Sequence, residues 1–169
     1  SNDEEFAGGI VAILETATIE NSKNTGNVIG STNIGGIAGE SKGTITQCRN
    51  DGQVSKVVGV ICKTVNLGGL VGKNGEAARL SNSKNYGNVN SETDTLVNLG
   101  GICGILYNNS IVELCENNGA ISGSGKEIIP NEDTNTNCAS CTSNNGGSAS
   151  TDDFGQLNIG IIYGKYQEI

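Results

Sequence analysis

The sequence predicts an all-β fold, a β-solenoid similar to a parallel β-helix, with about four to five rungs in a single repeat domain over residues 1–169. The chain contains 26 glycines but no Met, Trp or His and only six aromatic residues, so it has few bulky side chains to fill a conventional core. Aliphatic residues occur in short runs bounded by Gly, Asn, Ser or Thr, which is typical of short strands between tight turns. Two motifs also recur every 26 to 35 residues or so, about the spacing of solenoid repeats.

The first motif, called here the glycine-pair motif, is a pair of glycines followed by an aliphatic residue. Its second glycines are Gly9, Gly36, Gly69 and Gly101, and its aliphatic residues are Ile10, Ile37, Leu70 and Ile102. The position three residues before the second glycine holds Phe6 in the first copy and an asparagine in the others, at Asn33, Asn66 and Asn98. Asn158 stands at the same position before 159–163, so a degraded fifth copy is predicted there. Stacked at the strand spacing of about 4.8 Å, the aliphatic residues predict an internal ladder. The residues directly after this ladder, at 11, 38, 71 and 103, are apolar as well and would point outward in a strand. They predict an outer apolar face that is covered by the segments 57–61 and 128–129.

The second motif is Asn-x-Gly, and it marks a corner of each rung. Its asparagines are Asn24, Asn50, Asn85 and Asn117, and 144–146 is a plausible fifth copy. The asparagine side chain closes a turn onto the N–H two residues on, and the glycine accepts a positive φ. One rung then contains a strand, a variable excursion, a second strand, the corner and a third strand. We predict rungs at about 6–33, 34–66, 67–98 and 99–122, followed by a degenerate rung or insertion over 123–169.

The residue before each corner asparagine predicts a column of side chains on the outer surface, made of Lys23, Arg49, Lys84 and Glu116. Like charges in this column repel. One interpretation is a solvated face whose side chains splay apart; the other is a small anion-binding stripe for sulfated or uronic sugars. An exposed tyrosine would provide a platform for a glycan, and Tyr86, at a corner, is the best candidate among Tyr86, Tyr107, Tyr163 and Tyr166.

Composition excludes several classes of function. The net charge of −8 with two arginines argues against binding to nucleic acid, and no apolar run approaches the roughly 20 residues that membrane insertion needs. The absence of histidine excludes Ser-His-Asp and Cys-His sites, so we expect neither an enzyme nor a cofactor. We expect no metal site, although oxygen-rich segments at 131–135 and 150–153 leave calcium open.

The six cysteines are interpreted from the repeat alignment. Cys48 and Cys115 occupy the same place in rungs separated by another rung, which puts them too far apart for a bridge. The simpler interpretation is that these two cysteines are small, buried, apolar side chains inside the solenoid. Cys138 and Cys141 lie in a polar segment, where both a local disulfide and free thiols remain open.

The segments 36–39, 69–72 and 101–104, each followed by an Asn-x-Gly corner, resemble the GLUG-type repeats of bacterial surface adhesins and of regions attached to IgA-specific peptidases. The resemblance covers about residues 6 to 122 well and 157–164 weakly. It implies a β-solenoid in a secreted or wall-displayed bacterial protein and brings no catalytic residues. We therefore expect a non-catalytic extracellular module for surface display or adhesion, the scaffold or binding face of a larger protein, with its flanking domains and a host glycan or protein as partners.

Two alternatives remain: a carbohydrate-binding module of a secreted enzyme, and a small β-helix polysaccharide lyase that works with Arg, Lys and carboxylates. A lyase should gather basic and acidic groups over one groove, and a glycan binder should expose aromatic side chains. A spacer should show neither.

Overall fold

The fold is given by a computed structural model of the chain. It describes residues 4–91, 96–107, 109–124 and 141–142 with their side chains, and the backbone of 127–130, 138–139, 143, 147–150, 156–160 and 163–167. All regular secondary structure in these ranges is β-strand. The described residues contain no helix that is long and apolar enough to cross a membrane.

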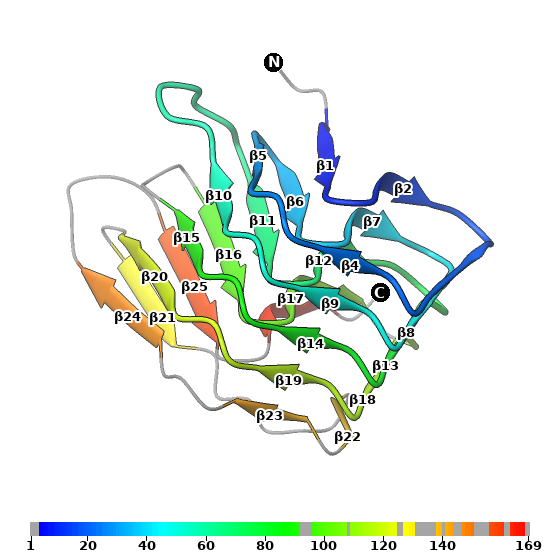
Figure 1. The fold of residues 1–169 in the computed structure, drawn as a ribbon. Coiled ribbons are helices and arrows are strands. Elements are labelled where there is room, and N and C mark those ends of the chain that lie inside the picture. The colour runs from blue at the N-terminus through cyan, green and yellow to red at the C-terminus, as the bar shows by residue number, and fades with distance from the viewer. Residues whose placement is uncertain are drawn as a thin grey trace.

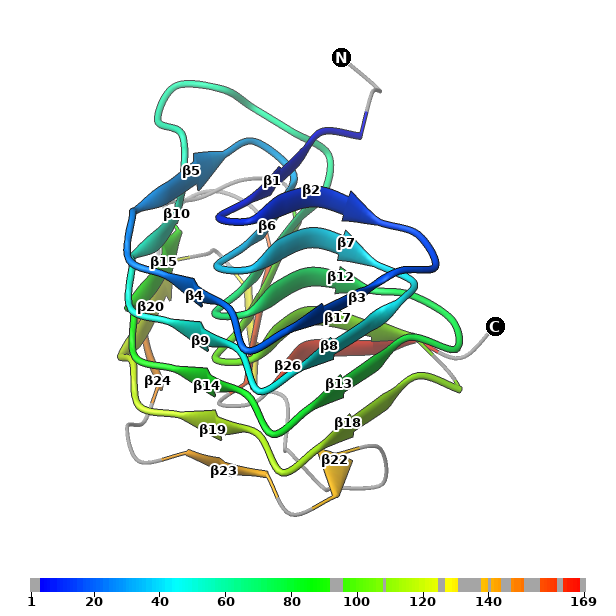
Figure 2. The same cartoon turned by 45° about the vertical axis from the view of Figure 1, so that its right-hand side comes forward.

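The predicted solenoid is confirmed, and each of its first four rungs consists of five short strands (Figure 2). The first rung contains β1 (Phe6–Gly8), β2 (Val11–Leu14), β3 (Thr18–Glu20), β4 (Lys23–Asn24) and β5 (Val28–Gly30). The second contains β6 (Asn33–Gly35), β7 (Ala38–Ser41), β8 (Thr44–Thr46), β9 (Arg49–Asn50) and β10 (Val54–Lys56). The third contains β11 (Val65–Gly68), β12 (Val71–Asn74), β13 (Arg79–Ser81), β14 (Lys84–Asn85) and β15 (Val89–Ser91), and the fourth β16 (Leu96–Gly100), β17 (Cys103–Tyr107), β18 (Ile111–Glu113), β19 (Glu116–Asn117) and β20 (Ile121–Ser124). The prediction of three strands in each rung was wrong, because each rung is divided into five strands of two to five residues by bends of two or more residues.

Equivalent strands of successive rungs pair in parallel, and this pairing builds five sheets, here named A to E after the strand order within a rung (Figure 1). In sheet A, Asn33 pairs with Phe6 on one side and Asn66 on the other, and Asn98 pairs in turn with Asn158. The alignment of the glycine-pair motifs is therefore confirmed, including the degraded fifth copy.

The last part of the chain departs from simple stacking. Strands β22 (Cys138–Ala139), β23 (Thr142–Ser143) and β24 (Gly147–Ser150) extend sheets C, D and E, so the segment after residue 123 does form part of a rung. Strand β26 (Tyr163–Gln167) extends sheet B. Strand β25 (Gln156–Gly160) lies in sheet A between β16 and β21 (Glu127–Pro130), although β21 precedes it in the chain. Ser143 is the residue opposite Asn117, and the predicted fifth corner at 144–146 lies outside the described residues.

The interior is divided into two apolar cores. One core lies among sheets B, C and D and includes Ile37, Leu70 and Ile102, whereas the other lies between sheets A and E. The two motifs meet between the cores: a β-carbon added to Gly36 would lie 2.3 Å from Cγ of Asn50 and 2.3 Å from the carbonyl oxygen of Gly69. The glycine pair is therefore required where the chain packs directly on the corner asparagines.

Two predictions about the aliphatic columns need correction. Ile37, Leu70 and Ile102 are fully buried as predicted, but Ile10 is 42% exposed because the first rung lies at the end of sheet B and has a neighbour on one side only. The second column, formed by Ala38, Val71 and Cys103, is buried in the same core rather than facing outward. The chain turns between β6 and β7, so two successive residues point inward there.

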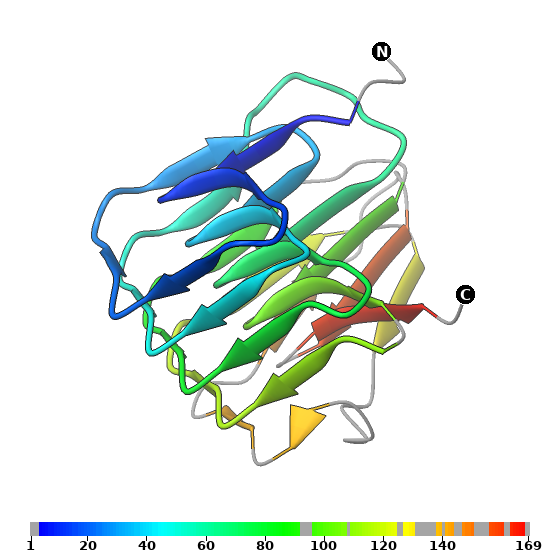
Figure 3. The same cartoon turned by 90° about the vertical axis from the view of Figure 1, so that its right-hand side faces the viewer.

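No segment is therefore needed to cover an outer apolar face. Val58 and Ile61, predicted to do so, are 76% and 84% exposed, on a β10–β11 loop that projects beyond the first rung (Figures 2 and 3). The side chains of residues 128 and 129 lie outside the described part.

The corner glycines have a role different from the predicted one. Gly59 is the one described glycine with a positive φ, of 84°, so the glycines of the Asn-x-Gly corners do not supply left-handed turns. A β-carbon on Gly52 would instead lie 1.9 Å from the carbonyl oxygen of Gly26, and one on Gly87 would lie 1.8 Å from that of Gly52. These glycines let successive backbones stack closely. Four other residues with a positive φ lie between sheets C and D, at Asn21, Gln47, Asn82 and Leu114, and two lie between sheets B and C, at Ala77 and Asn109.

Candidate binding surfaces

The corner asparagines form a buried hydrogen-bonded ladder that fixes the outer surface of sheet D. The side-chain amide of Asn24 donates to Oδ1 of Asn50 at 2.8 Å, Asn50 donates to Asn85 at 2.9 Å, and Asn85 donates to Asn117 at 2.8 Å. Each Oδ1 also accepts the N–H of the glycine two residues on, at 3.1 to 3.3 Å. The predicted turn is thus confirmed, and its side chain also joins neighbouring rungs.

A second ladder lies in sheet A. The amide of Asn66 donates to Oδ1 of Asn33 at 2.7 Å, and the amide of Asn98 donates to Oδ1 of Asn66 at 2.6 Å. Asn33 and Asn98 are each 1% exposed. Both ladders satisfy buried polar groups while holding the register of the rungs, since a buried amide without a partner is costly.

The predicted outer column is present: Lys23 pairs with Arg49, Arg49 with Lys84, and Lys84 with Glu116 in sheet D. Its positive charges are matched by carboxylates. Asp51 lies 2.8 Å from Nζ of Lys23 and also binds Arg49, while Glu116 lies 2.8 Å from Nζ of Lys84. The hydrogen bonds from Arg49 and Lys23 lower the pKa of Asp51, and the bond to Glu116 raises the pKa of Lys84. The expected mutual repulsion is therefore offset within the column.

Tyr86 lies beside this column and is 40% exposed. The guanidinium carbon of Arg49 lies 4.2 Å from the centre of its ring, so one face of the ring is in contact with a cation. A flat sugar would have only the remaining surface of Tyr86 to bind. The side chains of Tyr163 and Tyr166 lie outside the described part of the chain.

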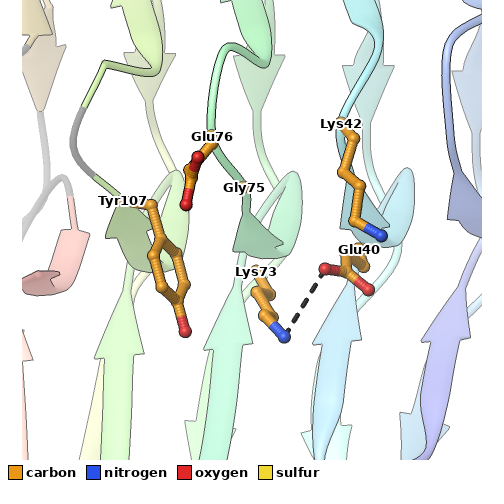
Figure 4. Close-up of a pocket in the computed structure, with 6 residues that line it drawn as sticks. All are labelled: Glu40, Lys42, Lys73, Gly75, Glu76 and Tyr107. Carbon is orange, nitrogen blue, oxygen red and sulfur yellow. Dashed lines mark ion pairs between the residues drawn. The ribbon is translucent and has the colours of Figure 1, made fainter. Parts of the chain in front are cut away.

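A pocket of about 330 Å³ lies at the end of sheet B (Figure 4). It is lined by side chains of three consecutive rungs: Glu40 and Lys42 from the second, Lys73, Gly75 and Glu76 from the third, and Tyr107 from the fourth. Glu40 and Lys73 are neighbours across β7 and β12. The structure thus brings together acidic, basic and aromatic groups here that the sequence analysis did not group.

The floor of the pocket contains a shielded ion pair. The side chain of Glu40 is 7% exposed and that of Lys73 17%, with Nζ 3.5 Å from Oε1 of Glu40. Glu4 approaches the same Nζ at 3.2 Å, and the ring centre of Tyr107 lies 5.8 Å from it. Burial alone would lower the pKa of Lys73, but the charges of Glu40 and Glu4 outweigh it and raise this pKa. Lys73 is therefore a cation at neutral pH and not a proton acceptor.

A signal for this pocket does exist in the sequence. Lys42, Gly75 and Tyr107 each follow the second glycine of a glycine-pair motif by six residues, at 36 to 42, 69 to 75 and 101 to 107. The same offset in the first rung gives Glu15, which forms a 3.4 Å ion pair with Lys42. Extending the motif alignment by six residues would have placed these side chains in one column.

The described residues test part of the predictions for the cysteines and for calcium. Cys48 and Cys115 are free and buried, as predicted, and Cys103 is free and buried as well. Cys141 is in a disulfide, and the side chain of Cys138 is outside the described part. Among the described residues, no group of three or more His, Cys, Asp or Glu side chains could hold a metal ion. The segments proposed for calcium fall almost entirely outside those residues.

Comparison of the chain with protein-family models, with curated proteins and with solved structures found no match.

Proposed function

We propose that this chain is a non-catalytic module of a bacterial surface protein, built on GLUG-type repeats, that acts as a stiff scaffold for display and adhesion. The observation that carries the proposal is the in-register stacking of all five sheets, joined by two buried asparagine ladders. Each rung adds about 4.8 Å of length and presents the same outward columns, so such an array extends and displays a surface in a fixed orientation.

The state of the charged groups supports a scaffold over a lyase. A lyase needs a basic side chain that is free to accept a proton from the sugar, and its pKa has to lie near the working pH. Lys23, Arg49 and Lys84 are instead paired with carboxylates, and the pKa of Lys73 is raised. These pairs stabilise a surface but supply no free base.

The experiment that tests the proposal is protease shaving of intact cells of the native bacterium. Peptides of this chain should appear in the medium when protease is added to intact cells, whereas peptides of a cytosolic control protein should appear only after lysis. If peptides of this chain also required lysis, surface display would be refuted.

A second experiment separates a spacer from an adhesin that binds glycans. The purified chain is screened on a glycan array with and without calcium, beside a variant that combines Lys23→Ala, Arg49→Ala and Lys84→Ala. Binding that is lost in the variant would assign the column to glycan recognition. Release of unsaturated products from a polyuronate, followed by ultraviolet absorbance, would contradict the non-catalytic assignment.

A further inference from the structure

The pocket at the end of sheet B exists because one column of side chains is interrupted by a glycine. Leu14, Ser41, Asn74 and Leu106 are in register across β2, β7, β12 and β17. The residues that follow them are Glu15, Lys42, Gly75 and Tyr107. The N–H of Gly75 donates to the carbonyl of Ser41 at 2.8 Å, so the rungs remain paired there. The missing side chain leaves a hollow between Lys42 and Tyr107 (Figure 4).

The hollow has carboxylates on more than one side. Glu40 is 6% exposed, and its one ion-pair partner in the described structure, Lys73, lies at 3.5 Å and is shared with Glu4. Glu76 lies on the side of Tyr107 (Figure 4), and its carboxylate makes no ion pair within the described residues. The buried carboxylate of Glu40 is thus only partly neutralised, and the exposed carboxylate of Glu76 is not neutralised by any described residue.

The local charge balance selects the sign of a ligand. The pocket residues with their ion-pair partners comprise the carboxylates of Glu4, Glu15, Glu40 and Glu76 against the ammonium groups of Lys42 and Lys73. The sum is negative, as is the charge of the whole chain, −8. Tyr107 adds an aromatic face, which attracts cations, and Nζ of Lys73 already lies 5.8 Å from its centre. An anionic ligand would be repelled by this arrangement.

We propose that this pocket binds an organic cation, an ammonium or guanidinium group carried on a short aliphatic stem. The charged group is held by Glu76 and Glu40, and the stem packs against Tyr107 above Gly75. A volume of about 330 Å³ accommodates one such group. A free amine and a Lys or Arg side chain of a partner protein share this chemistry. The inference goes beyond the scaffold role and does not depend on where the protein is located.

The experiment is a titration of the ¹⁵N-labelled chain followed by NMR at the amides of Gly75 and Tyr107. The probes are butylammonium, N-acetyl-lysine methylamide and N-acetyl-arginine methylamide, with the neutral N-acetyl-norleucine methylamide as the matched control. The cationic probes should shift these resonances at concentrations where the neutral probe does not. Added salt should lower the affinity of the cationic probes, because it screens the charges. If butylammonium binds with the same affinity as the lysine derivative, the ligand is a free amine. If the amino-acid derivatives bind more tightly than butylammonium, the ligand is a side chain of a partner protein.

Variants identify the groups that hold the cation. Tyr107→Leu should weaken binding about two- to fivefold, and Glu76→Gln should weaken it by at least as much. Tyr86→Leu and Glu20→Gln change exposed residues elsewhere on the solenoid and should leave binding unchanged. Amide dispersion in the NMR spectrum checks that each variant is folded. Equal shifts with the neutral probe, or unaltered affinity in both pocket variants, would overturn the proposal.

Discussion

Replacing Asn50 by alanine tests the asparagine ladder at its most connected point. Asn50 is fully buried and makes four side-chain hydrogen bonds. It donates to Gly52 O at 2.8 Å and to Asn85 Oδ1 at 2.9 Å, and it accepts from Gly52 N at 3.2 Å and from Asn24 Nδ2 at 2.8 Å. The substitution removes all four bonds at a site to which water has no access.

The expected loss follows from this count. A net contribution of about 1 kcal/mol for each bond gives a loss of about 4 kcal/mol in the free energy of unfolding. Asn24→Ala is the matched control, because Asn24 makes three such bonds and lies in the end rung, where it is 8% exposed. Water can replace part of what is lost there, so we expect about half the effect, roughly 2 kcal/mol.

The assay is urea denaturation followed by far-ultraviolet circular dichroism and tyrosine fluorescence. With a slope of about 2 to 3 kcal/mol per molar urea, Asn50→Ala should lower the midpoint by between about 1 and 2 M. Solenoids can unfold rung by rung, so the two signals must give coincident transitions before a free energy is derived. If Asn50→Ala and Asn24→Ala proved equally destabilising, the reasoning from the number of hydrogen bonds and their burial would be refuted.

Three further predictions concern other parts of the fold. Ser41→Ala removes a fully buried hydroxyl that has no hydrogen-bond partner in the described structure and should raise the free energy of unfolding by about 1 kcal/mol. Ser83→Ala removes a buried hydroxyl with two hydrogen-bond partners and should lower the free energy of unfolding by about 2 kcal/mol. Urea midpoints of Ser41→Ala and Ser83→Ala that move in the same direction would contradict this difference in hydrogen bonding. Leu114→Gly relieves a φ of 52° at an exposed residue and should stabilise by about 1 kcal/mol in the same assay, whereas a loss would show that the leucine side chain matters more. Burial raises the pKa of Cys115 from 9.0 to about 11, so stability should fall as pH rises from 9 to 11, because only the unfolded thiol ionises there; a Cys115→Ser variant with an equally steep fall would exclude this cause.

The sequence was sufficient for the fold because its two motifs recur in register. The positions of Asn33, Asn66 and Asn98 relative to the glycine pairs are the alignment that the sheets adopt. The buried aliphatic residues and the asparagine turns follow from the same alignment, since stacking forces equivalent residues together. Ile10 was misjudged because burial depends on a covering rung, which a column of equivalent residues does not reveal.

Backbone conformation and charge pairing were beyond the sequence analysis. Glycine has two possible reasons to occupy a corner, positive φ and close backbone approach, and only coordinates distinguish them. Leu114 at positive φ could not be expected, since leucine rarely adopts that conformation. The charge pairing in the outer column depends on Asp51, which reaches both Lys23 and Arg49 from the position after the corner asparagine. The pocket depends on the absence of a side chain at Gly75.

The position of β25 between β16 and β21 constrains the order in which the molecule can assemble. The first four rungs can form in chain order, because each new strand finds a completed neighbour. The place of β25, by contrast, lies between two strands that are both synthesised before it. Sheet A therefore stays incomplete until β25 arrives, and in a chain that emerges N-terminus first β25 follows every strand of sheets C, D and E. Once in place, this segment can be pulled out of sheet A only by breaking hydrogen bonds along both of its edges.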